Sequence, residues 1–304
     1  MVTSRTLAAL LPAMLAVTMA CSGTGTSSSA PSASSLPSMS PLAAGSPPPT
    51  ISASPSSVLP PAGTTTSQAP TLSLVGLGDS IPGAGGQTDT PLDSYVVLVG
   101  EAASKALGRT VAVTNLATND GVGSDGLLSR VRNDSVHRAA LAAADIVTIT
   151  IGTNDWQGAC DWPGDDPCWA RGLASVPKNL AAILDQIKDL RKGRPTAIRV
   201  TTYYDSYIGN PTNLTLVGKP SDPWPSEFHP FYRAALETFN KTICGVAEAH
   251  GAICVDLAVP FNGPSHDGPA TALLLADHVH PNQAGHDLIA KTIAATGFAP
   301  LERP

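Results

Sequence analysis

The sequence predicts an α/β fold, specifically a three-layer α/β/α sandwich around a five-stranded parallel, flavodoxin-like sheet. Two observations predict this class. Short apolar runs typical of strands alternate with longer segments whose apolar residues recur at helical spacing. The run Ile-Val-Thr-Ile-Thr-Ile at 146–151 lacks polar alternation, which indicates a strand buried on both faces of a parallel sheet. Such strands, joined by right-handed helical crossovers, form layers.

The elements follow in order along one domain, residues 71–304, which has no internal repeat and no second linker. Its helices are expected to stop at turn residues, as the first does at Gly108. The expected strands span 72–77, 111–116, 146–151, 197–203 and 253–257. The expected helices span 95–107, 127–143 with an interruption near Asn133, 173–190, 231–249 and 283–295.

The first 20 residues are typical of a secretory signal peptide. They carry one basic residue, Arg5, then an apolar stretch and small residues before Cys21. The stretch is too short for a transmembrane anchor. Thr18-Met19-Ala20-Cys21 resembles a bacterial lipobox, in which the cysteine is lipidated, although Thr18 replaces the usual aliphatic residue. We therefore expect a lipidated Cys21, with ordinary cleavage and release as the alternative.

Residues 21–70 form a separate region of unusual composition. From Ser22 to Pro70 the chain is almost entirely Ser, Pro, Thr, Ala and Gly, without a charged residue. Such a segment buries too little apolar surface to offset the entropy lost on ordering, so it is predicted to be a disordered tether. The chain is thus expected to be an exported, outward-facing membrane lipoprotein, or secreted, with membrane contact only through its lipid.

Four cysteines remain besides Cys21. An even number in an exported protein favours disulfides, and closeness in sequence favours the pairs Cys160–Cys168 and Cys244–Cys254. A zinc site is the alternative, but no pair has the C-x2-C spacing that such sites favour. The net charge of −6 argues against a nucleic-acid partner, because no basic stripe is present to meet phosphates.

The predicted first strand ends in Gly78-Asp79-Ser80, followed by a turn-rich stretch. In α/β sheets ligands bind outside the carboxyl ends of the strands, so Ser80 is placed where chemistry occurs. A serine hydroxyl becomes a nucleophile when a base accepts its proton and donors hold the resulting oxyanion. The alternative is that Asp79 and Ser80 only cap a helix.

Two further strand ends carry candidate oxyanion donors. Gly121-Val122-Gly123-Ser124 follows the second strand, and glycine leaves its backbone N–H open to a ligand. Gly152-Thr153-Asn154-Asp155 follows the most buried strand, and the Asn154 amide is a neutral, directional donor. Simple turns are the alternative for both segments.

The fourth segment is Asp277-His278-Val279-His280-Pro281. An imidazole is the usual general base, and a carboxylate orients its ring and stabilises the imidazolium. The spacing of three lets one turn present Asp277 and His280 on the same side. A metal site through His278 and His280 is the alternative, for which only His266 and Asp267 lie nearby in sequence.

Taken in order, these four segments resemble the blocks of the SGNH (GDSL-like) hydrolase family, over residues from about 72 to 297. The resemblance implies that Ser80 attacks an acyl carbonyl, that His280 is the base and that Asp277 orients it. It implies oxyanion donation by the Ser80 and Gly121 N–H groups and the Asn154 side chain. Gly123 is a rival for Gly121, because Asn115 and Gly121 are one residue further apart than is common in the family. No metal or cofactor is implied.

The expected function is a serine esterase or lipase-type hydrolase acting on a small-molecule, lipid or glycan ester, as a monomer. The alternatives are an acyltransferase or deacetylase acting on envelope glycans, and a catalytically silent wall-binding protein. Trp156 and Trp224 are candidate substrate-binding residues, since they lie beside the Asn154 turn and in the long 205–227 insertion. Packing of a small-cored loop is the alternative for Trp156 and its neighbours Trp162 and Trp169.

Overall fold

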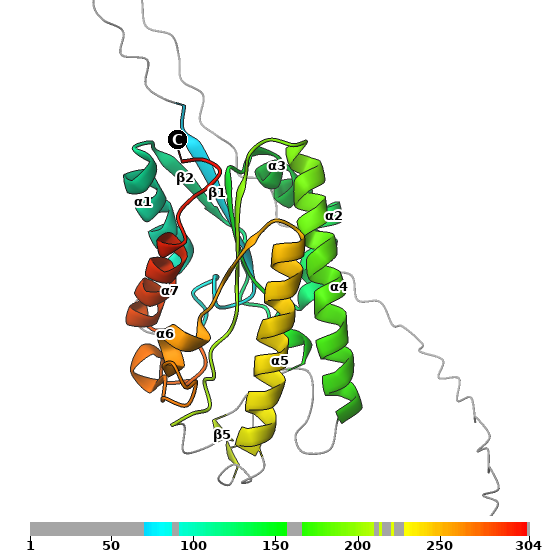
Figure 1. The fold of residues 1–304 in the computed structure, drawn as a ribbon, viewed down its shortest axis with the longest axis vertical. Coiled ribbons are helices and arrows are strands. Elements are labelled where there is room, and N and C mark those ends of the chain that lie inside the picture. Colours follow the sequence, from blue (N-terminus) through cyan, green and yellow to red (C-terminus); the bar gives the residue numbers. More distant parts are fainter. Residues whose placement is uncertain are drawn as a thin grey trace, which may run out of the picture. The chain divides into compact units, whose positions relative to one another are not determined.

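The structure is a computed structural model, and it describes residues 70–86, 91–156, 166–209, 213–214, 220–221 and 228–302 (Figure 1). Several predictions concern residues outside these ranges. They are the signal peptide, the lipidation of Cys21, the tether, and the roles of Cys160, Trp162 and Trp224.

The centre of the domain is a five-stranded parallel sheet with the strand order β2-β1-β3-β4-β7. This order is flavodoxin-like, with the first strand between the second and third, and it confirms the predicted fold class. β3 is buried along its whole length, as its unbroken apolar and β-branched sequence predicts. The strands span Leu72–Gly78 (β1), Val111–Asn115 (β2), Ile146–Thr150 (β3), Ala197–Thr201 (β4) and Ile253–Val255 (β7).

Helices cover both faces of the sheet (Figure 1). Helices α1 (Tyr95–Leu107) and α7 (Gln283–Ala295) pack against each other on one face. The other face carries α2 (Ser124–Asn133), α3 (Ser135–Ala143), α4 (Asp166–Arg191) and α5 (Phe228–Ala249).

Local sequence explains where these helices begin and end. The Ser94 hydroxyl accepts a hydrogen bond from the Val96 amide at the start of α1, and Gly108 ends that helix in the left-handed conformation. Asn282 caps α7 by accepting from the Gly285 amide. The capping residues therefore fix the helix bounds that the apolar spacing predicts.

The remaining differences from the predicted elements lie near the carboxyl edge of the sheet. β4 and β7 end two residues earlier than predicted, since the chain turns away into loops held by side-chain hydrogen bonds. α4 begins at Asp166, well before the predicted start. The short helix α6 (Ala258–Asn262) and the short antiparallel pair β5 (Asn213–Leu214) and β6 (Pro220–Ser221) were not predicted, because such short elements carry no periodic signal.

Cys244 and Cys254 form a disulfide that joins α5 to β7, in agreement with the predicted pairing. Cys168 is also disulfide-bonded, and its predicted partner, Cys160, lies outside the described residues. Within the part of the chain that the structure describes, no helix is both long enough and apolar enough to cross a membrane.

Candidate active site

The Ser80 turn begins at Gly78, whose backbone has φ +138°. A side chain there would collide with the Thr150 carbonyl of the neighbouring strand, so only glycine fits. The turn is closed by hydrogen bonds from the Asp79 amide to Thr150 O (3.2 Å) and from the Gly85 amide to Ser80 O (2.7 Å). Ser80 is consequently presented, partly exposed, at the carboxyl end of β1.

The loop before α7 carries Asp277 and His280. A bridge between Leu274 and Pro281 closes this loop, and the Leu275 amide donates to His280 O at 2.8 Å. Asn282 holds the base of the loop by donating to Leu274 O at 3.1 Å. The loop is therefore a tight turn anchored at the start of α7.

Ser80, His280 and Asp277 form a continuous hydrogen-bonded chain. His280 Nε2 lies 2.8 Å from Ser80 Oγ, and His280 Nδ1 lies 2.8 Å from Asp277 Oδ2. The other carboxylate oxygen of Asp277 accepts from the Val279 and His280 amides, both at 2.9 Å. The carboxylate is thus held on both sides, and the ring is oriented toward the serine.

The environment of Asp277 favours its charged form. Burial alone would raise the pKa of this carboxyl, but hydrogen bonds from the His280 ring and from the Val279 and His280 amides bring it below its usual value. An ionised Asp277 can hold the Nδ1–H tautomer of His280, which leaves Nε2 free to accept the serine proton.

The segments after β2 and β3 are tied to each other. The Asn154 Nδ2 atom donates to Val122 O at 3.0 Å, and the Asp155 carboxylate accepts from the Ser124 amide at 2.8 Å and hydroxyl at 2.6 Å. An amide nitrogen carries two hydrogens, so Asn154 keeps one for a ligand.

The two candidate glycines lie in different surroundings. Gly123 is the N-cap residue of α2, and a Cβ there would lie 3.2 Å from the Asp155 carboxylate. Gly121 is exposed with φ +70°, and a Cβ there would meet no atom within 4 Å. Gly123 thus has a packing role at the start of α2, whereas Gly121 faces open space.

Trp156 requires a correction. We predicted it as a substrate-binding residue, but its side chain is 0% exposed and packs among Trp169, Tyr232 and Phe239, with ring centroids 5.1–5.6 Å away. The prediction was wrong because the aromatic side chain fills the space between the ends of α4 and α5. Trp156 therefore has the packing role that was the alternative.

The structure adds residues near the site that the sequence patterns do not indicate. Gly86 has φ +107°, and a Cβ there would lie 2.9 Å from Asp277 Oδ2 and 3.0 Å from His280 Cβ. Tyr203 and Tyr204, which follow β4, each hydrogen-bond to one of the two loops. Of these residues, only Gly86 has a signal in the sequence, because two consecutive glycines, Gly85 and Gly86, are typical of a close backbone approach.

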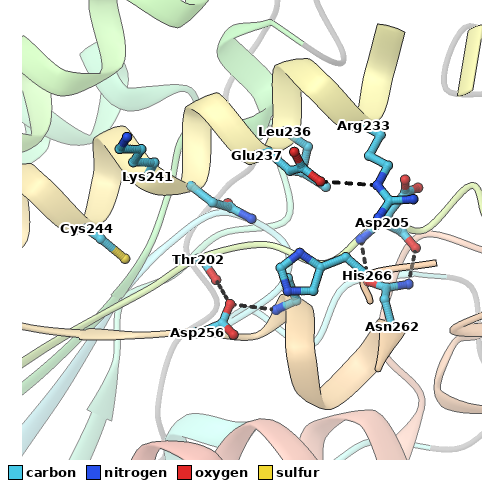
Figure 2. Close-up of a pocket in the computed structure, with 12 residues that line it drawn as sticks. Thr202, Asp205, Arg233, Leu236, Glu237, Lys241, Cys244, Asp256, Asn262 and His266 are labelled. Atoms are coloured by element: carbon cyan, nitrogen blue, oxygen red, sulfur yellow. Dashed lines mark hydrogen bonds and ion pairs between the residues drawn. The ribbon is translucent and has the colours of Figure 1, made fainter. Parts of the chain in front are cut away.

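A separate cavity of about 480 Å³ lies between α5, α6 and the ends of β4 and β7 (Figure 2). Its lining includes Thr202, Asp205, Asp256 and Asn262, and neither Ser80 nor His280. Among the described residues, no group of three or more His, Cys, Asp or Glu side chains is arranged as a metal site would require.

A partly exposed serine, linked through a histidine to a carboxylate at the carboxyl edge of a parallel sheet, is the arrangement of a serine hydrolase. Residues 77–288 match the sequence profile of the GDSL-like lipase/acylhydrolase family. The chain belongs to this family and is an ester-cleaving hydrolase.

Solved structures share the fold. A lipase, Lip_vut3, from a goat rumen metagenome matches with a TM-score of 0.61 at 19% identity, covering 76% of this chain and 100% of that one. A catalytic mutant of Axe2, an acetylxylan esterase from Geobacillus stearothermophilus, matches with a TM-score of 0.53 at 22% identity, covering 77% and 97%. No curated protein sequence is similar enough to count as a match.

Proposed function

We propose that the chain is a serine esterase that cleaves carboxylic esters through a Ser80–His280–Asp277 triad and an acyl-enzyme. The observation that carries this proposal is the hydrogen-bonded chain from Ser80 Oγ through the His280 ring to Asp277, with both links at 2.8 Å. This distance lies within the range that proton transfer between a nucleophile and its base needs.

In the proposed reaction, Ser80 Oγ attacks the carbonyl carbon of the ester while His280 Nε2 takes its proton. The tetrahedral intermediate collapses, and the proton on His280 passes to the departing alkoxide, which leaves as an alcohol. Water, deprotonated by the same nitrogen, then attacks the acyl-enzyme. The bond between Ser80 Oγ and the acyl carbon breaks, the acid leaves, and the proton on His280 returns to Ser80 Oγ. Asp277 keeps its charge throughout and stabilises the imidazolium that forms in each half-reaction.

The proposed oxyanion hole consists of the Ser80 N–H, the Gly121 N–H and the Asn154 side chain. Two observations support these donors. Asn154 is joined to the segment after β2 through Val122 O, and Asp155 holds the start of α2. Gly121, exposed and with open space around it, is favoured over Gly123, which packs on Asp155.

The test uses the purified full chain. We expect a fluorophosphonate probe to label the protein on Ser80 and short p-nitrophenyl esters to be hydrolysed, with turnover unchanged by a chelator. Absence of both labelling and turnover from a folded chain would contradict the proposal. Turnover that a chelator abolishes would indicate metal-assisted hydrolysis instead.

We further propose that the chain is exported and anchored through a lipidated Cys21, with residues 21–70 as the tether. The sequence pattern before Cys21 and the uncharged composition after it support this proposal. Mass spectrometry of the mature N-terminus tests it. A diacylglyceryl cysteine at position 21 is expected, and an unmodified terminus elsewhere would remove the anchor.

A further inference from the structure

Two consecutive tyrosines follow β4, and their hydroxyl groups bond to the two loops that carry the proposed triad. The Tyr203 hydroxyl donates to Asp79 Oδ2 at 2.5 Å, and Asp79 precedes Ser80. The Tyr204 hydroxyl donates to Val279 O at 2.7 Å, and Val279 precedes His280. One short segment therefore contacts both the Ser80 turn and the Asp277–His280 turn.

The backbone of this segment is held by two asparagine side chains that each use both ends of the amide. Asn240 of α5 accepts from the Tyr203 amide at 3.0 Å and donates to Tyr203 O at 2.7 Å. Asn262 of α6 does the same to Asp205, at 2.8 and 2.9 Å (Figure 2). Such paired bonds fix the backbone much as a neighbouring strand would.

The rings are fixed as well. Tyr203 and Tyr204 are only 4% and 5% exposed, and the Tyr204 ring stacks on Phe261 with the centroids 4.0 Å apart. Burial keeps the pKa of both hydroxyls well above the usual value, so they remain protonated donors at working pH. Two rigid donors at a fixed spacing therefore connect the two loops.

On this basis, and on the proposed triad mechanism, we propose that Tyr203 and Tyr204 are positioning residues that hold Ser80 and His280 at hydrogen-bonding distance. Ser80 and His280 are 200 residues apart in the sequence, and within the described part of the chain no strand pairing joins their two loops. A displacement of about 1 Å between reacting groups can lower a rate about a hundredfold. Removal of either hydroxyl frees one loop to shift relative to the other.

The surroundings of Asp79 explain why its hydrogen bond with the Tyr203 hydroxyl matters. Its carboxyl is 1% exposed and accepts from the Ile81 amide at 3.0 Å in addition to the Tyr203 hydroxyl. A buried carboxyl that loses a hydrogen-bond donor costs free energy in its present position, so we expect the Asp79 turn to shift until the carboxyl meets another donor. That turn includes Ser80.

The experiment compares Tyr203→Phe, Tyr204→Phe and the double variant with Tyr95→Phe as a matched control. Tyr95 is also fully buried and also makes a 2.5 Å hydrogen bond, but to Thr150 on β3 rather than to either loop. Each Tyr→Phe substitution removes one hydroxyl and keeps the ring, so the fold is expected to persist. The measurements are kcat and KM on a p-nitrophenyl ester, with melting temperatures for all four variants.

We expect kcat to fall about tenfold or more in Tyr203→Phe and in Tyr204→Phe, with KM within about twofold of the wild type. The double variant should lose less than the product of the two single losses, because one freed loop already disturbs the same distance. Tyr95→Phe should lose stability to a similar extent but keep its kcat.

The proposal is overturned if the wild type is active and Tyr203→Phe and Tyr204→Phe lower kcat no more than Tyr95→Phe does. It is also overturned if KM rises and kcat stays constant, since the tyrosines would then contribute to binding. A wild type that neither labels with a fluorophosphonate nor turns over ester is a failure of the proposed function, and it is seen before any tyrosine variant is measured.

Discussion

His280 Nε2 lies 2.8 Å from Ser80 Oγ, although 200 residues separate the two in the chain. The serine stands on the turn after β1 and the histidine in the loop before α7, at the carboxyl edge of the sheet. Among the residues that the structure describes, His250 Nδ1 also lies 2.8 Å from Asp185 Oδ1, but that pair lies at the surface and no hydrogen bond joins it to a serine. The site is therefore distinguished by its serine and not by the histidine–carboxylate pair.

Substitution of Ser80 or of His280 should abolish turnover under the proposed mechanism. Ser80→Ala and His280→Ala are each expected to lower kcat by roughly 10⁴- to 10⁶-fold, because triad members act as a unit. His250→Ala is the matched control and should keep full activity. Ester hydrolysis and fluorophosphonate labelling check both results, and labelling that persists in Ser80→Ala would identify a different nucleophile.

Asp277→Asn should lower kcat by about 10⁴-fold while the protein stays folded. An asparagine amide facing His280 Nδ1 favours the wrong tautomer, which leaves Nε2 protonated and unable to accept the serine proton. Asp185→Asn removes a carboxylate from the surface His250 pair and should leave kcat unchanged. A loss of less than about tenfold in Asp277→Asn would mean that another group orients the ring.

Asn154→Ala should lower kcat by about 10²- to 10³-fold, or roughly 3–4 kcal/mol of transition-state stabilisation, if its amide donates to the oxyanion. Asn179→Ala is a suitable control, because Asn179 donates to the Ser124 hydroxyl at 2.8 Å and so contacts the same end of α2. The control is expected to change kcat less than threefold. Equal losses in the two variants would indicate that Asn154 acts only by holding the loop.

Gly86→Ala should reduce kcat about ten- to a hundredfold. The added methyl group would approach Asp277 Oδ2 and His280 Cβ within about 3 Å and displace them from Ser80. Gly251→Ala is the control for backbone strain, because Gly251 also has positive φ (+70°) but a Cβ there meets no atom within 4 Å. The Gly251→Ala variant should lose about 1–2 kcal/mol of unfolding free energy and keep the wild-type turnover. Full activity in Gly86→Ala would mean that the Gly86 backbone lies farther from Asp277 and His280 than in the structure.

His286 should make folding stability depend on pH. Its side chain is buried on α7, and burial lowers its pKa to about 4, whereas the unfolded chain titrates near 6.5. Between these values the unfolded chain binds a proton that the folded chain does not. The contribution of His286 to the free energy of unfolding is therefore fully present above about pH 6.5 and is lost as the pH falls toward 4.

The expected loss over that window is roughly 2–3 kcal/mol. Asp79 acts with the opposite sign, because burial raises its folded pKa to about 6, so the His286 contribution must be isolated by substitution. In urea unfolding, lowering the pH from 7 to 4.5 should cost His286→Gln roughly 2–3 kcal/mol less unfolding free energy than it costs the wild type. His250→Gln, on the surface, should behave as the wild type does.

Much of the fold and of the candidate site follows from local sequence. Apolar runs ending in glycine predict the strands, and a Ser, Asn or Gly at the right position predicts the helix bounds, because both signals depend on neighbouring residues alone. Ser80, Asp277 and His280 can be predicted as site residues because each belongs to a recognisable motif at a strand end or in a loop. Such patterns say which residue types are present, not what surrounds them.

Packing decided the rest. Trp156 lies two residues from Asn154 and gives no sign in the sequence that it is buried, since burial depends on where α4 and α5 meet. Tyr203 and Tyr204 have no motif, and their contacts with Asp79 and Val279 exist only because the folded chain brings the segment after β4 against the Ser80 turn and the His280 loop. The sequence alone determined the chemistry available at the carboxyl edge of the sheet. The tertiary structure decided which side chains support that chemistry, because hydrogen bonds between residues far apart in the chain form only after the strands have paired.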